Sequence, residues 1–164
     1  MKYSYNWLKE LSGTKRPVEK VTEDLTMRAF EIEGVEKTGK SFPGVVVVEI
    51  LEIRKHPNAD KLQIAVVETR HASSVQKMEV VCGASNIAVG QKVPLALVGT
   101  KLPNGIEIKE AEIRGVKSRG MLCAADELGL GKDHSGIIIL DKDAKVGESV
   151  DKYLGINDTV IEIK

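Results

Sequence analysis

Ile-Arg-Gly-Val-Lys-Ser-Arg-Gly-Met-Leu-Cys-Ala-Ala-Asp-Glu-Leu-Gly, residues 113–129, joins a basic segment to an apolar one. We expect Gly115 and Gly120 to bracket a short flexible loop, because glycine tolerates backbone angles that a Cβ blocks. Lys117, Ser118 and Arg119 lie between them, and two cations beside a hydroxyl suit phosphate and sugar oxygens. The apolar run that follows predicts a buried strand. The alternative is an ordinary surface turn with solvated charges, since Gly, Ser and Lys are common in loops.

The length and composition are those of one folded domain, or of a domain with an appendage. The chain has 164 residues, of which 42% are hydrophobic, and this is enough for a buried core. Its 24 basic and 24 acidic residues balance, which excludes a strongly basic nucleic-acid binder. Residues 45–125 hold 11 basic and 8 acidic side chains, whereas residues 126–164 hold 5 and 9. We therefore expect any surface for a polyanion to lie in the central part and to be modest in charge.

The two cysteines, Cys82 and Cys123, each lie in an apolar run and form no CxxC motif. Two buried thiols in a reducing compartment are the expectation. No N-terminal apolar segment has the length of a signal peptide, and no run approaches membrane-spanning length. The simplest prediction is a cytoplasmic protein without membrane contact.

The sequence predicts three segments, at 1–40, 41–149 and 150–164. Apolar residues recur at helical spacing in the first thirty residues, which predicts helices with too little apolar surface to stand alone. We expect the last segment to pack on these helices through an apolar face. That face is made of Val150, Tyr153, Leu154 and Ile156.

The central segment predicts short strands separated by turns. A β-branched run over 45–53 is expected to form a bent strand that serves two sides of a barrel. Many short strands with almost no helix predict a small barrel. The fold class is therefore mainly β with α: a five-stranded OB-fold Greek-key barrel inserted in a small split helical domain. The other expected elements are strands over 62–69, 76–82, 93–98, 121–123 and 136–140, and a polar turn over 70–75.

Two motifs in this segment resemble the tRNA-binding OB-fold domain that several aminoacyl-tRNA synthetases share. One is His-Pro-Asn-Ala-Asp-Lys-Leu at 56–62, and the other is Arg-Gly-Val-Lys-Ser-Arg-Gly-Met-Leu at 114–122. Their combination, in this order and at this separation, is more specific than either motif alone.

Other stretches resemble the beta subunits of bacterial phenylalanine–tRNA synthetases, so that the likeness covers essentially the whole chain. They are the opening of the chain and residues 81–86, 127–130 and 133–137. The sequence departs from the family pattern at Ser85, where many members have proline, and at Ala29-Phe30, where Gly-Leu is usual.

This resemblance implies a place in a longer enzyme. The parent complex would join phenylalanine to its tRNA with ATP and magnesium, and the amino-acid-activating site would belong to the alpha subunit. Family beta subunits are several times longer, so we expect an N-terminal fragment that has no catalytic residues and no cofactor of its own. The expected partners are tRNA, the alpha subunit and the remainder of the beta subunit.

The candidate RNA-binding residues are the cationic or polar side chains in and beside the two motifs. They are Lys55, Asn58, Lys61, Arg114, Lys117, Ser118 and Arg119. Cations would neutralise phosphates, and hydroxyl and amide groups would meet ribose oxygens. Residues 45–125 contain no Phe, Tyr or Trp, so base stacking should contribute little. We therefore expect weak, sequence-tolerant and strongly salt-dependent binding.

No metal site or catalytic site is predicted. The spacing of His56, His71 and His134 fits neither a zinc site nor a catalytic base, and hydrogen bonds that stabilise loops are the expectation. A GxxxxGK[ST] loop is absent, so ATP binding by this chain is not expected. Two other roles stay open: a structural or protein-interaction module of the synthetase with little tRNA contact, and a free-standing tRNA-binding chaperone.

Overall fold

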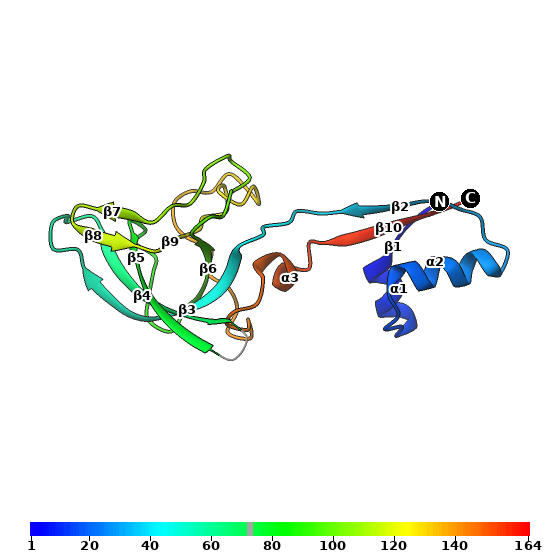
Figure 1. Cartoon of the computed structure of the whole chain (residues 1–164), viewed down its shortest axis with the longest axis horizontal. Coiled ribbons are helices and arrows are strands. Elements are labelled where there is room, and N and C mark those ends of the chain that lie inside the picture. Colours follow the sequence, from blue (N-terminus) through cyan, green and yellow to red (C-terminus); the bar gives the residue numbers. More distant parts are fainter. Residues whose placement is uncertain (72–73) are drawn as a thin grey trace. The chain divides into compact units, whose positions relative to one another are not determined.

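The computed structural model describes residues 1–71 and 74–164, which form two units (Figure 1). The terminal unit contains Met1–Ser41 and Gly155–Lys164, and the barrel unit contains Phe42–Leu154. The predicted return segment at 150–164 is therefore divided between them, since helix α3 (Val150–Leu154) belongs to the barrel unit. No helix in the described ranges is long and apolar enough to cross a membrane.

The terminal unit is built on a sheet as well as on the two expected helices. Strand β10 is its central strand and runs antiparallel to β1 and β2. The expectation of a helical domain is thus incomplete, because the two ends of the chain meet through strand pairing. The elements are β1 (Lys2–Ser4), α1 (Tyr5–Ser12), α2 (Val18–Met27), β2 (Ile32–Thr38) and β10 (Asp158–Ile163).

The start of α1 is capped from both ends of the chain. The Ser4 hydroxyl accepts a hydrogen bond from the Trp7 N–H at 3.0 Å, and the Asp158 carboxylate accepts one from the Asn6 N–H at 3.0 Å. These bonds satisfy donors that a helix start leaves without intrahelical partners. Partial burial raises the pKa of Asp158, but hydrogen bonds from Ser4, Asn6 and Thr159 outweigh burial, and the pKa lies below its ordinary value.

The apolar face predicted for 150–156 has other partners. Val150 is fully buried within the barrel unit, where α3 contacts strand β3 (Val45–Lys55). The Tyr153 hydroxyl lies 3.1 Å from an Asp141 carboxylate oxygen, to which it donates. The prediction that this face packs on residues 5–25 is therefore wrong for Val150 and Tyr153.

The barrel unit contains the predicted five-stranded antiparallel sheet, in the order β5-β4-β3-β6-β9. Strand β3 pairs through 45–49 with β6 and through 49–55 with β4, and its register shifts between Ile50 and Glu52. The prediction of one long bent strand that serves two sides is confirmed. The remaining strands are β4 (Gln63–His71), β5 (Ser74–Cys82), β6 (Lys92–Leu97), β9 (Gly120–Leu122) and the hairpin pair β7 (Ala111–Ile113) and β8 (Val116–Ser118).

Two other local predictions differ from the structure. The polar turn expected over 70–75 is largely strand, because β4 and β5 pair as far as His71 and Ser74, and residues 72 and 73 lie outside the described residues. The strand expected over 136–140 is reduced to single bridges that join Ile137 to Ala124 and Leu140 to Lys92.

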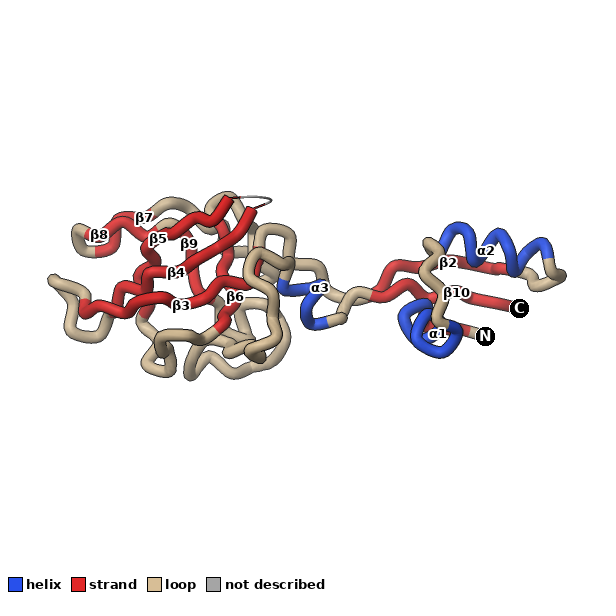
Figure 2. The backbone as a smooth tube through the Cα atoms, turned by 90° about the horizontal axis from the view of Figure 1, so that it is seen from below, coloured by secondary structure: helices blue, strands red, loops and turns tan. Residues whose placement is uncertain are grey.

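The curled sheet encloses an aliphatic core, as expected of an OB-like barrel. Val48, Ile50, Val67, Val80 and Leu95 have no exposed surface, and they come from β3, β4, β5 and β6. Figure 2 shows these strands side by side, with the β7–β8 hairpin next to β5. The barrel therefore offers a rigid support on which surface loops can be positioned.

Candidate nucleic-acid interface

The β7–β8 hairpin carries the first group of predicted RNA-binding residues. Its two-residue turn is Arg114-Gly115, with φ angles of 50° and 88°. Positive φ at both central residues is the geometry of a type I′ turn, which matches the twist of the flanking strands. Glycine adopts this geometry freely, whereas Arg114 is strained by it. The predicted loop between Gly115 and Gly120 is mostly strand, since β8 occupies Val116–Ser118.

His56 joins this hairpin to the other motif. Its Nε2 lies 2.9 Å from the Ile113 carbonyl oxygen and donates to it, so Nδ1 accepts from the Asn58 N–H at 3.1 Å. The Asn58 side-chain amide donates to the Arg114 carbonyl oxygen at 2.9 Å. His56 is only 5% exposed, and its expected role in stabilising a loop is confirmed. These contacts, which we call the His56 clamp, bring the two motifs together in space.

Ser118 has a different place from the one predicted. It is 3% exposed, its hydroxyl accepts from the Val81 N–H at 3.0 Å, and it donates to the Gly120 carbonyl oxygen at 3.0 Å. The adjacent Arg119 N–H donates to the Glu79 carbonyl oxygen at 3.1 Å. These bonds link β5 to the start of β9 and close the barrel. The expected free hydroxyl for a ribose is therefore not available at Ser118.

Gly120 is required by a close approach between strands. A Cβ at this position would lie 2.8 Å from the Ala96 carbonyl oxygen and 2.9 Å from Leu95 Cδ1. The φ angle of 152° adds strain for any other residue. The second glycine of the motif thus packs β9 against β6.

Lys117 and Arg119 are both exposed beside the seam, by which we mean the line where Ser118 joins β5 to β9. Arg119 Nε lies 3.9 Å from a Glu110 carboxylate oxygen, and the two side chains are 61% and 51% exposed. Such a solvated contact contributes little and leaves the guanidinium accessible. Lys117 stands opposite Glu112 in the hairpin register.

Sequence reasoning missed Lys77. A surface hollow of about 450 Å³ is lined by Lys77, Lys117 and Arg119 together with Val66, Met78 and Glu79. The carboxylate of Glu79 binds the Arg54 guanidinium, so part of its charge is compensated. Lys77 lies in a polar stretch without a motif, and only the pairing of β4 with β5 and the closure by Ser118 place it here. The hollow thus has three cations on its wall.

The remaining predicted residues lie near the His56 clamp. Lys55 ends β3, Lys61 lies in the loop that follows, and both are exposed. Asn58 is exposed as well, but its amide is engaged in the clamp. The predicted residues therefore form two neighbouring groups on the barrel unit, one at the His56 clamp and one beside the seam.

Other chemistry has little support in this region. The described residues contain no group of three or more His, Cys, Asp or Glu side chains that could hold a metal ion. Both cysteines are buried and free, as predicted. Burial, followed by the nearby Glu127 charge, raises the pKa of Cys123 to about 12, and burial also raises the pKa of Cys82. Thiols with such pKa values are poor nucleophiles.

Known proteins resemble this chain over its whole length. The chain is 43% identical over all of its 164 residues to "Phenylalanine--tRNA ligase beta subunit" of Dechloromonas aromatica, and 43% identical over 164 residues to that of Nitrosospira multiformis. It spans 20% and 21% of these relatives, about a fifth of their length. A solved structure, the MetRS related protein from Pyrococcus horikoshii, has a TM-score of 0.47 at 16% identity, over 84% of this chain and 98% of that one.

A family model described as "Putative tRNA binding domain" matches residues 45–149, which make up most of the chain and nearly all of the barrel unit. The two motifs joined by the His56 clamp both lie inside the matched range. The chain therefore belongs to this tRNA-binding-domain family.

Proposed function

We propose that the barrel unit binds tRNA through the sugar-phosphate backbone, at the surface formed by the His56 clamp and the seam beside it. The observation that carries the proposal is that two separate cationic stretches meet on one rigid support. The residues assigned to this surface are Lys55, Asn58, Lys61, Lys77, Arg114, Lys117 and Arg119. Ser118 acts indirectly, because its buried hydroxyl holds β5 and β9 together.

The physical basis is the neutralisation of phosphates. Each lysine or arginine that meets a phosphate releases condensed counterions, so affinity falls as salt rises. Backbone contacts position a nucleic acid without reading its sequence. Because residues 45–125 lack aromatic side chains, stacking contributes little here. The expected result is modest and strongly salt-dependent affinity.

The larger assembly is part of the same proposal. We infer from the relatives that the parent protein is the beta subunit of a phenylalanine–tRNA ligase, which works in the cytoplasm with an alpha subunit and charges tRNA with phenylalanine. ATP and magnesium would serve that reaction in parts of the complex other than this chain. The present chain supplies tRNA contacts and no catalytic group.

A titration with tRNA tests the proposal directly. Arg114→Ala with Lys117→Ala should weaken binding of fluorescently labelled tRNA and should reduce the slope of log K against log salt by about one per lost phosphate contact. Lys145→Ala is the matched control, since Lys145 is an exposed lysine of the barrel unit outside this surface. No binding at low salt, or equal binding by the double variant and the wild type, would remove the RNA role.

A further inference from the structure

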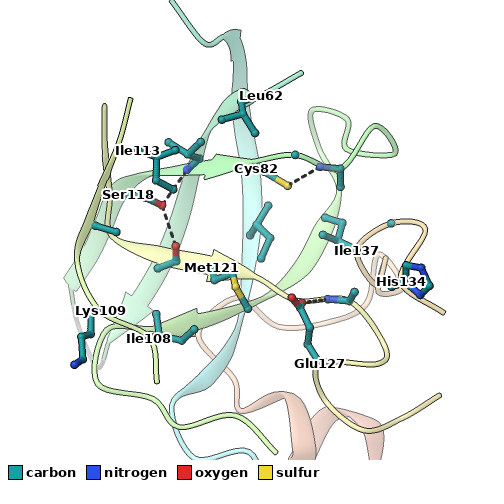
Figure 3. A pocket seen from close by; sticks show the side chains of 18 of the residues that line it. Leu62, Cys82, Ile108, Lys109, Ile113, Ser118, Met121, Glu127, His134 and Ile137 are labelled. Carbon is teal, nitrogen blue, oxygen red and sulfur yellow. Dashed lines mark hydrogen bonds between the residues drawn. The ribbon is translucent and has the colours of Figure 1, made fainter. Parts of the chain in front are cut away.

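An apolar groove lies beside the cationic surface, where β5 and β9 diverge (Figure 3). Its volume is about 620 Å³, within the range of roughly 300–1,000 Å³ that is typical of small-molecule sites. Aliphatic side chains and one thioether form most of its wall. They are Leu62, Val81, Ile108, Ile113, Met121 and Ile137. The groove can therefore cover the flat face of a planar apolar group.

Two carboxylates line this space: that of Glu107, which lies 3.9 Å from Lys109 Nζ, and that of Glu127 (Figure 3). One of the Glu127 oxygens, Oε2, accepts a hydrogen bond from the Ala124 N–H at 2.7 Å. The negative charge of Glu127 lies close enough to Cys123 to contribute to the raised pKa of that thiol. Among residues 1–71 and 74–164, no cation forms an ion pair with Glu127. The second oxygen is thus an acceptor that suits a ligand donor.

The groove is continuous with the proposed RNA surface. Ile113, which lines it, directly precedes the Arg114-Gly115 turn, and Ser118 lines it between Lys117 and Arg119. A sugar-phosphate chain held by these cations would pass the mouth of the groove. Lys109 and His134 also line the groove, but next to Glu127 a phosphate is disfavoured, because two negative charges repel each other, and an amine hydrogen-bond donor is favoured.

We propose that this groove binds an unpaired nucleobase with an exocyclic amine, namely cytosine, adenine or guanine, from the RNA that the cationic surface holds. This inference rests on the proposed function and adds base selectivity to it. The amine donates to Glu127, and the aliphatic walls cover the faces of the base where no aromatic side chain is present. Uracil lacks the amine, and its N3–H lies between two carbonyl oxygens that a carboxylate repels.

Single-stranded RNA oligomers of equal length test the inference. Fluorescence anisotropy at low salt should show that oligocytidylate and oligoadenylate bind about tenfold more tightly than oligouridylate. Glu127→Gln should abolish or reverse this preference, because the new amide donates where the carboxylate oxygen accepted. It should leave the affinity for oligouridylate equal or higher. Lys117→Ala should weaken all three oligomers by the same factor.

A second variant blocks the groove without touching its buried wall. Ala111 is exposed and lines the groove, so Ala111→Leu should fill part of it and remove the preference, while melting temperature reports that the barrel is intact. If all three oligomers bind equally and only Lys117→Ala weakens them, the result supports the RNA-binding surface and contradicts the base site. If none of the oligomers binds at low salt, the result contradicts the proposed function as well. If Ala111→Leu leaves RNA binding unchanged but weakens association with the rest of the parent complex, a protein segment occupies the groove and the base site is overturned.

Discussion

The terminal unit and the barrel unit are stabilised by different means. In the barrel unit, side chains from all five strands of the sheet form a continuous core in which many residues have no exposed surface. In the terminal unit, Tyr5 and Ile161 are the hydrophobic residues with buried side chains, and α2 has none. Trp7 is 52% exposed. The terminal unit therefore depends on strand pairing and helix caps, while the barrel depends on apolar burial.

This difference bears on where function can be placed. A well-packed core holds the loops that it supports in one arrangement, and the His56 clamp adds hydrogen bonds to that support. A unit with little buried apolar surface gains less free energy on folding and opens more easily. The cationic surface and the apolar groove both lie on the rigid unit, which fits a role in positioning a nucleic acid.

Denaturation with two separate probes should show the largest effect of this contrast. Trp7 is the single tryptophan and lies in the terminal unit, whereas Cys82 and Cys123 both lie in the barrel unit. We expect the Trp7 fluorescence to change at lower urea concentration than the thiols become reactive at neutral pH. In the folded barrel the pKa of Cys123 is about 12, so thiolate forms only in strong alkali, and unfolding restores an ordinary value. Coincident transitions would contradict the contrast.

Leu95→Ala should destabilise the barrel more than the loss of a single hydrogen bond does. Leu95 has no exposed surface, and its removal leaves a cavity that should cost about 3 kcal/mol in the free energy of unfolding. The thiol probe should report this loss, while the Trp7 transition stays in place. Val98→Ala is the control, because Val98 is half exposed and its loss should change stability by less than about 0.5 kcal/mol. A shift of both transitions by Leu95→Ala would show that the units unfold together.

Ser118→Ala separates a structural role from direct RNA contact. The substitution leaves the buried Val81 N–H without an acceptor, which should cost about 2 kcal/mol of barrel stability. The salt dependence of tRNA binding should keep its slope, since no phosphate contact is removed. Ser85→Ala, at an exposed serine of the same unit, should change neither quantity. A loss of affinity for tRNA without a change in barrel stability would instead show that Ser118 contacts the RNA directly.

Much of the barrel could be predicted because most of its strands have a recognisable pattern in their own sequence. The β-branched run of β3, the apolar runs around both cysteines and the glycines of the hairpin each carry their own pattern. The two motifs likewise pointed to the loop after β3 and to the hairpin. Periodicity and turn chemistry act over a few residues, and this is the range in which sequence reasoning is strongest.

The errors concern contacts between distant parts of the chain. Ser118 looks like a loop residue beside two cations, and only the closure of β5 on β9 buries it. Lys77 reaches the cationic surface through the same closure. Strand β10 finds its partners more than a hundred residues away, and its short alternating pattern does not specify them. Long-range pairing of this kind is set by the whole fold rather than by local pattern.

Asp158→Ala should have the smallest of these effects, and it is confined to the terminal unit. The carboxylate caps α1 through the Asn6 N–H, so its loss should cost about 1 kcal/mol. The folded-state pKa of Asp158 is lowered, so the stabilisation is present above the unfolded-state value of about 3.9 and is lost as pH falls through the folded-state pKa. The stability that the Trp7 transition reports should therefore fall in acid by more in the wild type than in the variant.

Glu33→Ala, at an exposed carboxylate of the same unit, should keep the wild-type acid dependence. If Asp158→Ala loses as much stability in acid as the wild type does, other carboxylates set the pH response, and the terminal unit does not depend on this cap.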